Sequence, residues 1–167
     1  MIIANSIVNG GTLYLAGNGG SAAIAEHVEA ELMGRLVRDR LPIPAISLTS
    51  NSATLTCIAN DFGYENVFSR QLEALCSPLD VFVGFSTSGR SRNIIKAIQT
   101  CFGKNAACIL FTGLGFEADN TWGKPNKLTT FIIPTLNTAN IQLAHLAAIH
   151  PMCSLIENQL FSDSSNE

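Results

Sequence analysis

The stretch Thr-Leu-Tyr-Leu-Ala-Gly-Asn-Gly-Gly-Ser-Ala at residues 12–22 starts as an apolar run and ends as a glycine-rich turn. Further apolar runs of strand length follow it, separated by segments of helix length. Candidate strands lie at 12–16, 45–48, 80–85, 107–111 and 130–133, and candidate helices at 21–35, 52–58, 67–75, 91–102 and 139–160. Such alternation is typical of a parallel sheet with helices on both faces. The sequence therefore predicts an α/β fold with a single doubly wound, flavodoxin-like sheet of five parallel strands.

Length and composition set the size and the class of the protein. The chain has 167 residues, of which 47% are hydrophobic and only 14% are charged. We expect one domain over 1–167, with a short N-terminal lead at 1–10 and a frayed tail at 162–167. So little charge is unusual for the surface of a monomer, which favours a homo-oligomer. The net charge of −3 offers no electrostatic signature for binding nucleic acid or an anionic membrane.

The cysteines and the ends of the chain bear on its location. None of the five cysteines lies in a C-x-x-C pair or at zinc-finger spacing, which indicates reduced thiols in a cytoplasmic protein. The N-terminus lacks the basic start and long apolar run of a signal peptide. Lys127 and Glu157 enclose an uncharged stretch, but prolines, histidines and amides interrupt it. We therefore expect no membrane span.

The first strand-to-helix junction contains a glycine-rich turn. Gly17, Gly19 and Ala22 match the dinucleotide pattern G-x-G-x-x-A, and Ser21 is placed to cap the helix that follows. The second predicted strand, however, is not followed by the acidic residue that would hold a nicotinamide ribose. Backbone amides at the helix start favour an anionic ligand instead of a nicotinamide cofactor.

The second junction reads Ser86-Thr87-Ser88-Gly89-Arg90-Ser91 and follows the third predicted strand. Its hydroxyl groups, together with the free amides of the next helix, suit a phosphate dianion. A Ser-rich turn that merely caps a helix is the alternative interpretation of this motif by itself. A second glycine loop at an equivalent junction favours phosphate binding, and the missing Walker lysine argues against a nucleoside triphosphatase.

Candidate acid, base and metal-ligating groups lie on the first and last predicted helices. His27 and Glu31 are four residues apart and share one helix face, while Gln142 and His150 share a face eight residues apart. This pattern suits either a metal site or acid–base chemistry. Each residue taken singly is as well explained by a structural role, and His145, in an apolar stretch, is interpreted as a hydrogen-bonded core histidine.

Six motifs in order carry a resemblance to a known family. They are Gly17-Asn18-Gly19-Gly20-Ser21; His27 and Glu31 with Gly34-Arg35; Asn60-Asp61-Phe62-Gly63; Phe68-Ser69-Arg70-Gln71; Ser86-Thr87-Ser88-Gly89-x-Ser91; and Ile141-Gln142 with His150. In order and spacing the chain resembles the phosphoheptose isomerases of the sugar isomerase (SIS) domain superfamily. The resemblance extends from Gly10 to Phe161.

The resemblance implies an aldose–ketose isomerase that converts sedoheptulose 7-phosphate to D-glycero-D-manno-heptose 7-phosphate for bacterial surface polysaccharides. It implies Glu31 and His150 as the catalytic pair and zinc as a cofactor, with His27, Glu31, Gln142 and His150 as its ligands. It further implies a homotetramer. The substrate-binding residues that it implies are Asn18, Gly19, Gly20, Ser21, Arg35, Asn60, Asp61, Ser86, Thr87, Ser88, Ser91 and Gln142.

Some positions depart from the family pattern and leave a second interpretation open. Ala22 stands where the family usually has a histidine, few residues precede Gly11, and Pro151 predicts a kink in the last helix at His150. The alternative is a non-catalytic SIS protein that binds a protein partner, resembling the protein associated with the bacterial replication initiator. That group lacks counterparts of Glu31 and His150, which this chain has.

Overall fold

The computed structural model describes residues 2–116 and 128–161 and contains the predicted parallel sheet. The strand order is β2-β1-β3-β4-β5, with every neighbouring pair parallel. The strands are β1 (Leu13–Gly17), β2 (Ala45–Ser47), β3 (Val81–Ser86), β4 (Ala107–Gly113) and β5 (Leu128–Ile133). This is the doubly wound order of the flavodoxin-like fold, so the predicted α/β class is confirmed.

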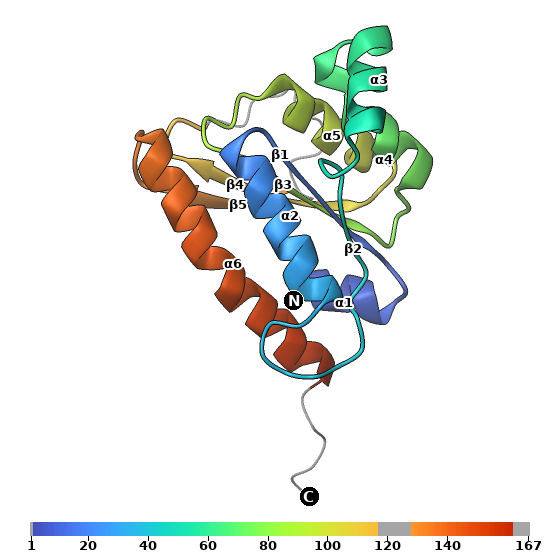
Figure 1. Cartoon of the computed structure of the whole chain (residues 1–167), viewed down its shortest axis with the longest axis vertical. Helices are drawn as coiled ribbons and strands as arrows, with labels where there is room; N and C mark the ends of the chain where they lie inside the picture. Colours follow the sequence, from blue (N-terminus) through green and yellow to red (C-terminus); the bar gives the residue numbers. More distant parts are fainter. Residues whose placement is uncertain (1, 117–127, 162–167) are drawn as a thin grey trace, which may run out of the picture.

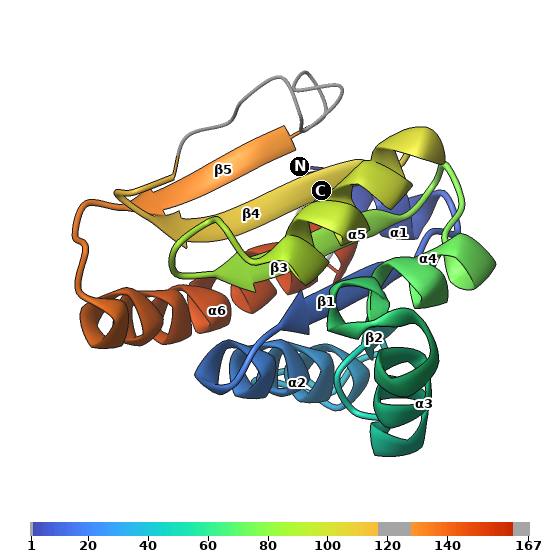
Figure 2. The same ribbon diagram turned by 90° about the horizontal axis from the view of Figure 1, so that it is seen from above.

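Helices cover both faces of the sheet, as Figures 1 and 2 show. They are α1 (Ile2–Val8), α2 (Gly20–Met33), α3 (Ser52–Phe62), α4 (Ser69–Leu75), α5 (Arg92–Gly103) and α6 (Thr138–Phe161), with a short 3-10 helix η1 (Tyr64–Asn66) before α4. One core lies between the sheet and α1, α2 and α6, and a second between the sheet and α4 and α5. Along β1, Leu13 and Leu15 face the first core, while Tyr14 and Ala16 face the second.

Helix α1 was not predicted, because the segment 1–10 reads only as a short lead. It is seven residues long, and no charged residue lies in its first or last turn. Ile3 and Ala4 are buried, and Ile3 joins the core formed with α2 and α6. Tertiary packing therefore stabilises a helix too short to form alone. Of the other expectations, the frayed tail at 162–167 and most of the loop expected at 113–127 lie outside the described residues.

Helix α3 projects from the body of the domain. None of its residues is buried, and in Figures 1 and 2 it stands apart from the sheet. Its N-terminus is capped by Asn51, whose side chain accepts a hydrogen bond from the Thr54 amide at 3.0 Å. Local capping thus supports a helix that the rest of this chain leaves largely uncovered.

Helix α6 passes through Pro151 and continues to Phe161. The helix predicted at 139–160 therefore runs past Pro151 without a break (Figure 1), and the kink predicted at His150 stays a prediction. Packing on one side holds the helix: Ile149, Cys153 and Ile156 are all buried in the core with α1 and α2. Within the part of the chain that the structure describes, no helix combines the length and the apolar character needed to cross a bilayer.

We expect Pro151→Ala to raise the free energy of unfolding by about 2 kcal/mol. Alanine restores the backbone N–H that proline removes, and this gain exceeds the smaller loss of rigidity in the unfolded chain. Urea denaturation of the two proteins at equal concentration measures the difference. An unchanged or lower stability would show that contacts of the proline ring outweigh the missing hydrogen bond.

Candidate active site

Helices α2 and α6 bring two imidazoles and one carboxylate together. His27 and Glu31 lie one turn apart on α2, and His27 Nε2 is 3.0 Å from Glu31 Oε1. From α6, His150 Nε2 approaches His27 Nε2 to 3.3 Å and Glu31 Oε1 to 3.7 Å. The side chain of Glu31 is 19% exposed and that of His150 is 51% exposed, so the group is partly shielded but open to a ligand.

The separations within this cluster suit a metal ion. The three ligand atoms of His27, Glu31 and His150 all lie within 4.8 Å of one another. Ligands of a tetrahedral zinc with bonds near 2.0–2.1 Å stand about 3.3 Å apart, close to the spacings observed here. Gln142, the fourth predicted ligand, lines one shallow hollow with His27 and Gly20. A Cβ atom at Gly20 would lie 2.9 Å from the Gln142 amide, so glycine makes room for that side chain.

The first loop joins β1 to α2 in a tight turn. Gly19, with φ of 56°, occupies the cap position of α2, and no side chain caps this end. Ser21 was predicted to be the cap. It lies instead inside the first turn and is buried, with its amide donating to Asn18 O at 3.0 Å. A Cβ atom at Gly17 would collide with the Ser21 backbone, so both glycines are required by the course of the chain.

The second loop joins β3 to α5 and presents its hydroxyl groups at the start of that helix. Ser86 is buried and hydrogen-bonds Ser91 through the two Oγ atoms at 2.9 Å. Ser88 is exposed, while Thr87 and Ser91 are half-buried. The N-cap Ser91 makes no capping hydrogen bond, and of the first-turn amides of α5 the Ile94 N–H donates to Asn93 Oδ1 at 3.0 Å. The Arg92 and Asn93 amides at the helix start are the ones that could face an anion.

A pair of asparagines links the two loops. Asn93 Nδ2 donates to Asn18 Oδ1 at 2.7 Å, and Asn18 Nδ2 donates to Asn93 Oδ1 at 3.0 Å. Tyr64 adds a hydrogen bond from its hydroxyl to Asn18 Oδ1 at 3.0 Å. Asn93 is only 3% exposed. Neither Asn93 nor Tyr64 is among the site residues predicted from the sequence. The position of Asn93, two residues after Ser91 of the second loop, is the sequence feature that could have indicated it.

Three predicted substrate-binding residues are not brought to the Glu31–His150 pair by this chain. Arg35 is exposed beyond the end of α2, and Asn60 and Asp61 are exposed on α3. Asn60 Nδ2 donates to Asp61 Oδ1 at 2.8 Å. Among the described residues, no hydrogen bond or ion pair connects these three side chains to the pair.

His145 is fully buried between α6 and the sheet, as a core histidine should be. Its Nε2 lies 3.4 Å from Thr112 O, whereas Nδ1 has no hydrogen-bond partner. The expectation of a fully hydrogen-bonded residue is therefore only half right. Burial lowers the pKa of His145, which keeps the ring neutral beside Phe85 and Phe111.

The fold, together with likeness to known proteins, defines the class of protein. Residues 1–113 match the family model described as the SIS domain. The Aquifex aeolicus (strain VF5) phosphoheptose isomerase is 42% identical over 161 residues, covering 95% of this chain and 81% of that relative. A phosphoheptose isomerase structure from Francisella tularensis has a TM-score of 0.87 at 32% identity, covering 94% of this chain and 82% of that one. A second such structure, from Neisseria gonorrhoeae, has a TM-score of 0.82 at 36% identity, covering 94% and 82%.

The chain therefore belongs to the phosphoheptose isomerase family of SIS-domain proteins, as its motifs predicted.

We expect Asn93→Asp to weaken the binding of inorganic phosphate at least about tenfold while the protein stays folded. The carboxylate cannot donate to Asn18 Oδ1, and it places a negative charge beside the second loop. Calorimetric titration with phosphate measures the effect. Asn5→Asp adds the same charge at an exposed position of α1 and serves as the control. Equal affinities for all three proteins would separate Asn93 from the site.

Proposed function

We propose that this site converts sedoheptulose 7-phosphate to D-glycero-D-manno-heptose 7-phosphate as an aldose–ketose isomerase. The observation that carries the proposal is the contact between Glu31 and His150 at 3.7 Å, on a fold whose two loops face an anion. The family relationship supports it, since relatives that are 42% identical, and of whose length the chain covers 81% and 77%, are phosphoheptose isomerases. No observation favours the non-catalytic alternative, whose relatives lack this pair.

Phosphate binding is the first role that we assign. Ser86, Thr87, Ser88 and Ser91 offer hydroxyl donors, and the Arg92 and Asn93 amides at the start of α5 add the positive end of the helix dipole. Asn18, Gly19, Gly20 and Ser21 line the sugar along the first loop. Holding the remote phosphate fixes the other end of the sugar at the reacting groups, so that binding energy is used for orientation.

Proton transfer is the second role, and the cluster on α2 and α6 supports it. The carboxylate of Glu31 removes the proton from C1 of the ketose, and the electron pair forms the C1–C2 double bond of an enediol. His150 gives a proton to the C2 oxygen and accepts the proton of the C1 hydroxyl. Glu31 then returns its proton to C2, and the C1 carbonyl forms. The net reaction moves two hydrogens within one molecule and needs no oxidant or reductant.

A zinc ion held by His27, Glu31 and His150 fits the spacing of these three ligand atoms, and Gln142 is the fourth ligand that the family resemblance implies. Zinc bound to Glu31 would compete with the role of that carboxylate as the base, so metal binding and proton abstraction need not coincide. When bound, such an ion would stabilise negative charge on the sugar oxygens.

We expect elemental analysis of protein purified without chelators to find about one zinc per chain, and His27→Ala to lose most of it. Metal-free protein with full activity would contradict a zinc requirement.

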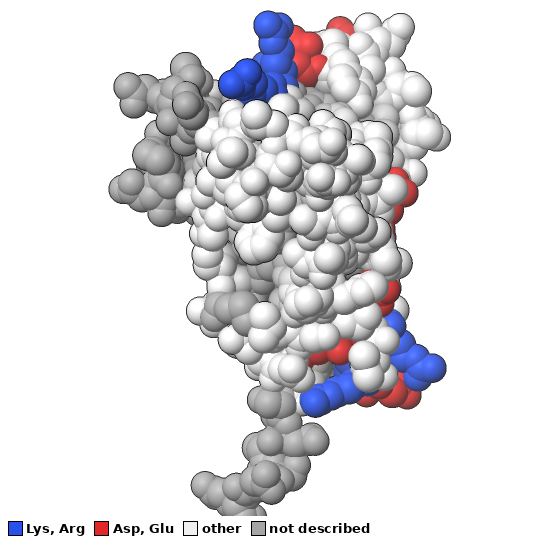
Figure 3. All heavy atoms as spheres, turned by 90° about the vertical axis from the view of Figure 1, so that its left-hand side faces the viewer, with Lys and Arg blue, Asp and Glu red and all other residues white. Residues whose placement is uncertain are grey.

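We further propose that the protein is a homo-oligomer, a tetramer by family resemblance, in the cytoplasm. The face over α6 and β5 is almost free of charged side chains (Figure 3). It includes a groove of about 650 Å³ lined mainly by apolar residues such as Phe111, Phe131 and Leu155. Asn60, Asp61 and Arg35 are then available to complete the site of a neighbouring copy. The unpaired state of all five cysteines agrees with a reducing compartment.

The decisive experiment follows aldose formation from sedoheptulose 7-phosphate. We expect wild-type protein to turn the substrate over, and Glu31→Gln to lower kcat at least about a thousandfold without unfolding, since it removes the base. Glu29→Gln changes the same chemical group at a neighbouring position of α2 and should keep nearly full activity. A wild-type protein that binds phosphate but does not turn over the sugar would favour the non-catalytic alternative.

A further inference from the structure

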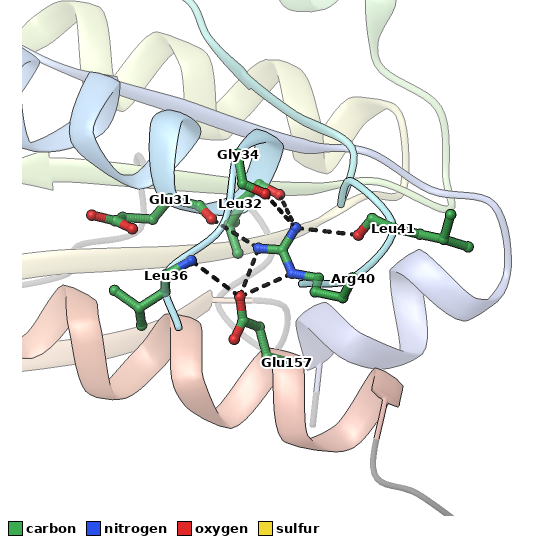
Figure 4. A network of polar contacts seen from close by, with 7 residues as sticks. All are labelled: Glu31, Leu32, Gly34, Leu36, Arg40, Leu41 and Glu157. Atoms are coloured by element: carbon green, nitrogen blue, oxygen red, sulfur yellow. Dashed lines mark hydrogen bonds and ion pairs between the residues drawn. The ribbon is translucent and has the colours of Figure 1, made fainter. Parts of the chain in front are cut away.

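An arginine outside the predicted site is buried at the junction of the two helices that carry the catalytic pair. Arg40 lies in the loop after α2, and its side chain is 3% exposed. Its partner is Glu157 on α6, whose side chain is 4% exposed. Figure 4 shows the guanidinium between the C-terminal end of α2 and the Glu157 carboxylate. Burial of two opposite charges at this place calls for a physical reason.

All three nitrogen atoms of the Arg40 guanidinium donate hydrogen bonds. Its Nε and Nη2 atoms reach Glu157 Oε1 at 2.9 and 2.7 Å. The remaining bonds go to main-chain carbonyls: Nη2 to Glu31 O at 2.8 Å, and Nη1 to Leu32 O at 2.7 Å, Gly34 O at 2.9 Å and Leu41 O at 3.2 Å. Two of these carbonyls, those of Glu31 and Leu32, belong to the last turn of α2, where no further helical turn supplies amide donors; Leu32 O also accepts from the Ile43 amide at 3.0 Å. The positive charge also lies at the negative end of the helix dipole.

The planar fork of arginine is what this arrangement requires. Its donors point in fixed directions and meet one carboxylate and several carbonyls at the same time. Lysine carries the same charge at a single point and cannot reach all of these acceptors. The site therefore depends on the geometry of the side chain as well as on its charge.

The same network touches both members of the catalytic pair through their helices. Arg40 binds the main-chain carbonyl of Glu31 itself. Glu157 follows His150 by seven residues, two turns of α6, and so lies on the same face about 10 Å further along. Helices α2 and α6 are thus joined at two levels, once by Glu31 with His150 and once by Arg40 with Glu157.

We propose that Arg40 and Glu157 are positioning residues that fix the distance between the Glu31 carboxylate and the His150 imidazole. This inference rests on the proposed isomerase function. Stability alone is a poor explanation, because well-packed apolar side chains often replace a buried ion pair without loss of stability. An ion pair with directed hydrogen bonds, by contrast, defines one register between the helices.

Kinetics of Arg40→Lys test the proposal. We expect kcat for sedoheptulose 7-phosphate to fall about 10- to 100-fold, since a displacement near 1 Å at the reacting groups has effects of this size. KM should stay within about twofold, because the phosphate-binding loop is untouched. Arg38→Lys, an exposed arginine of the same loop, should leave both constants unchanged. An Arg40→Lys enzyme with wild-type kcat would overturn the proposal.

A second control separates positioning from general destabilisation. Asp80 directly precedes β3, the central strand, and accepts hydrogen bonds from the Thr12 and Ser77 amides. Asp80→Asn should lower stability but keep kcat. If kcat falls in both variants in proportion to their loss of stability, Arg40 is only structural and the proposal fails.

A readout without substrate keeps this test apart from that of the proposed function. The rings of His27 and His150 lie 5.1 Å apart, close enough for a nuclear Overhauser contact between their protons. We expect this contact to weaken or vanish in Arg40→Lys and to persist in Arg38→Lys and Asp80→Asn. An inactive wild-type protein would refute the isomerase function, whereas an unchanged contact in Arg40→Lys would refute the positioning role.

Discussion

The packing of helix α2 against helix α6 is the constraint on which the site depends. The two helices come from opposite ends of the chain, and their contact places Glu31 and His150 3.7 Å apart. Two residues so far apart in the sequence come together because both helices cover the same face of the sheet. The buried Arg40–Glu157 pair lies two turns from this contact and joins the same helices.

The sheet order brings the loops after β1 and β3 to the same edge. Because β1 and β3 are parallel neighbours, with Gly17 opposite Phe85, the loops that follow them start side by side. The reciprocal hydrogen bonds of Asn18 and Asn93 then hold one loop to the other. The sheet topology therefore brings the two loops close together, and the hydrogen bonds between Asn18 and the buried Asn93 fix the position of one loop against the other. The contact between Glu31 and His150 and the position of the two loops are both consequences of how parallel strands and their helices are arranged.

Much of this arrangement could be predicted from the sequence, because it depends on patterns that are local. Apolar runs alternating with helix-length segments gave all five strands, and helical spacing placed His27 and Glu31 on one face. Features that depend on tertiary packing were missed or misjudged. Helix α1 is stabilised by burial of Ile3, and Ser21 lies inside the first turn of α2 instead of capping it. Nothing in the local sequence around Arg40 indicated that its partner would lie on the last helix.

The central claim is that Glu31 and His150 face one carbon skeleton whose phosphate lies on the Ser86–Ser91 loop. A crystal structure of the inactive Glu31→Gln variant with sedoheptulose 7-phosphate bound tests it most directly. We expect C1 and C2 of the sugar within hydrogen-bond reach of residue 31 and His150, and the phosphate on the hydroxyl groups and amides at the start of α5. A sugar bound away from both side chains, or a phosphate held by other residues, would contradict the claim.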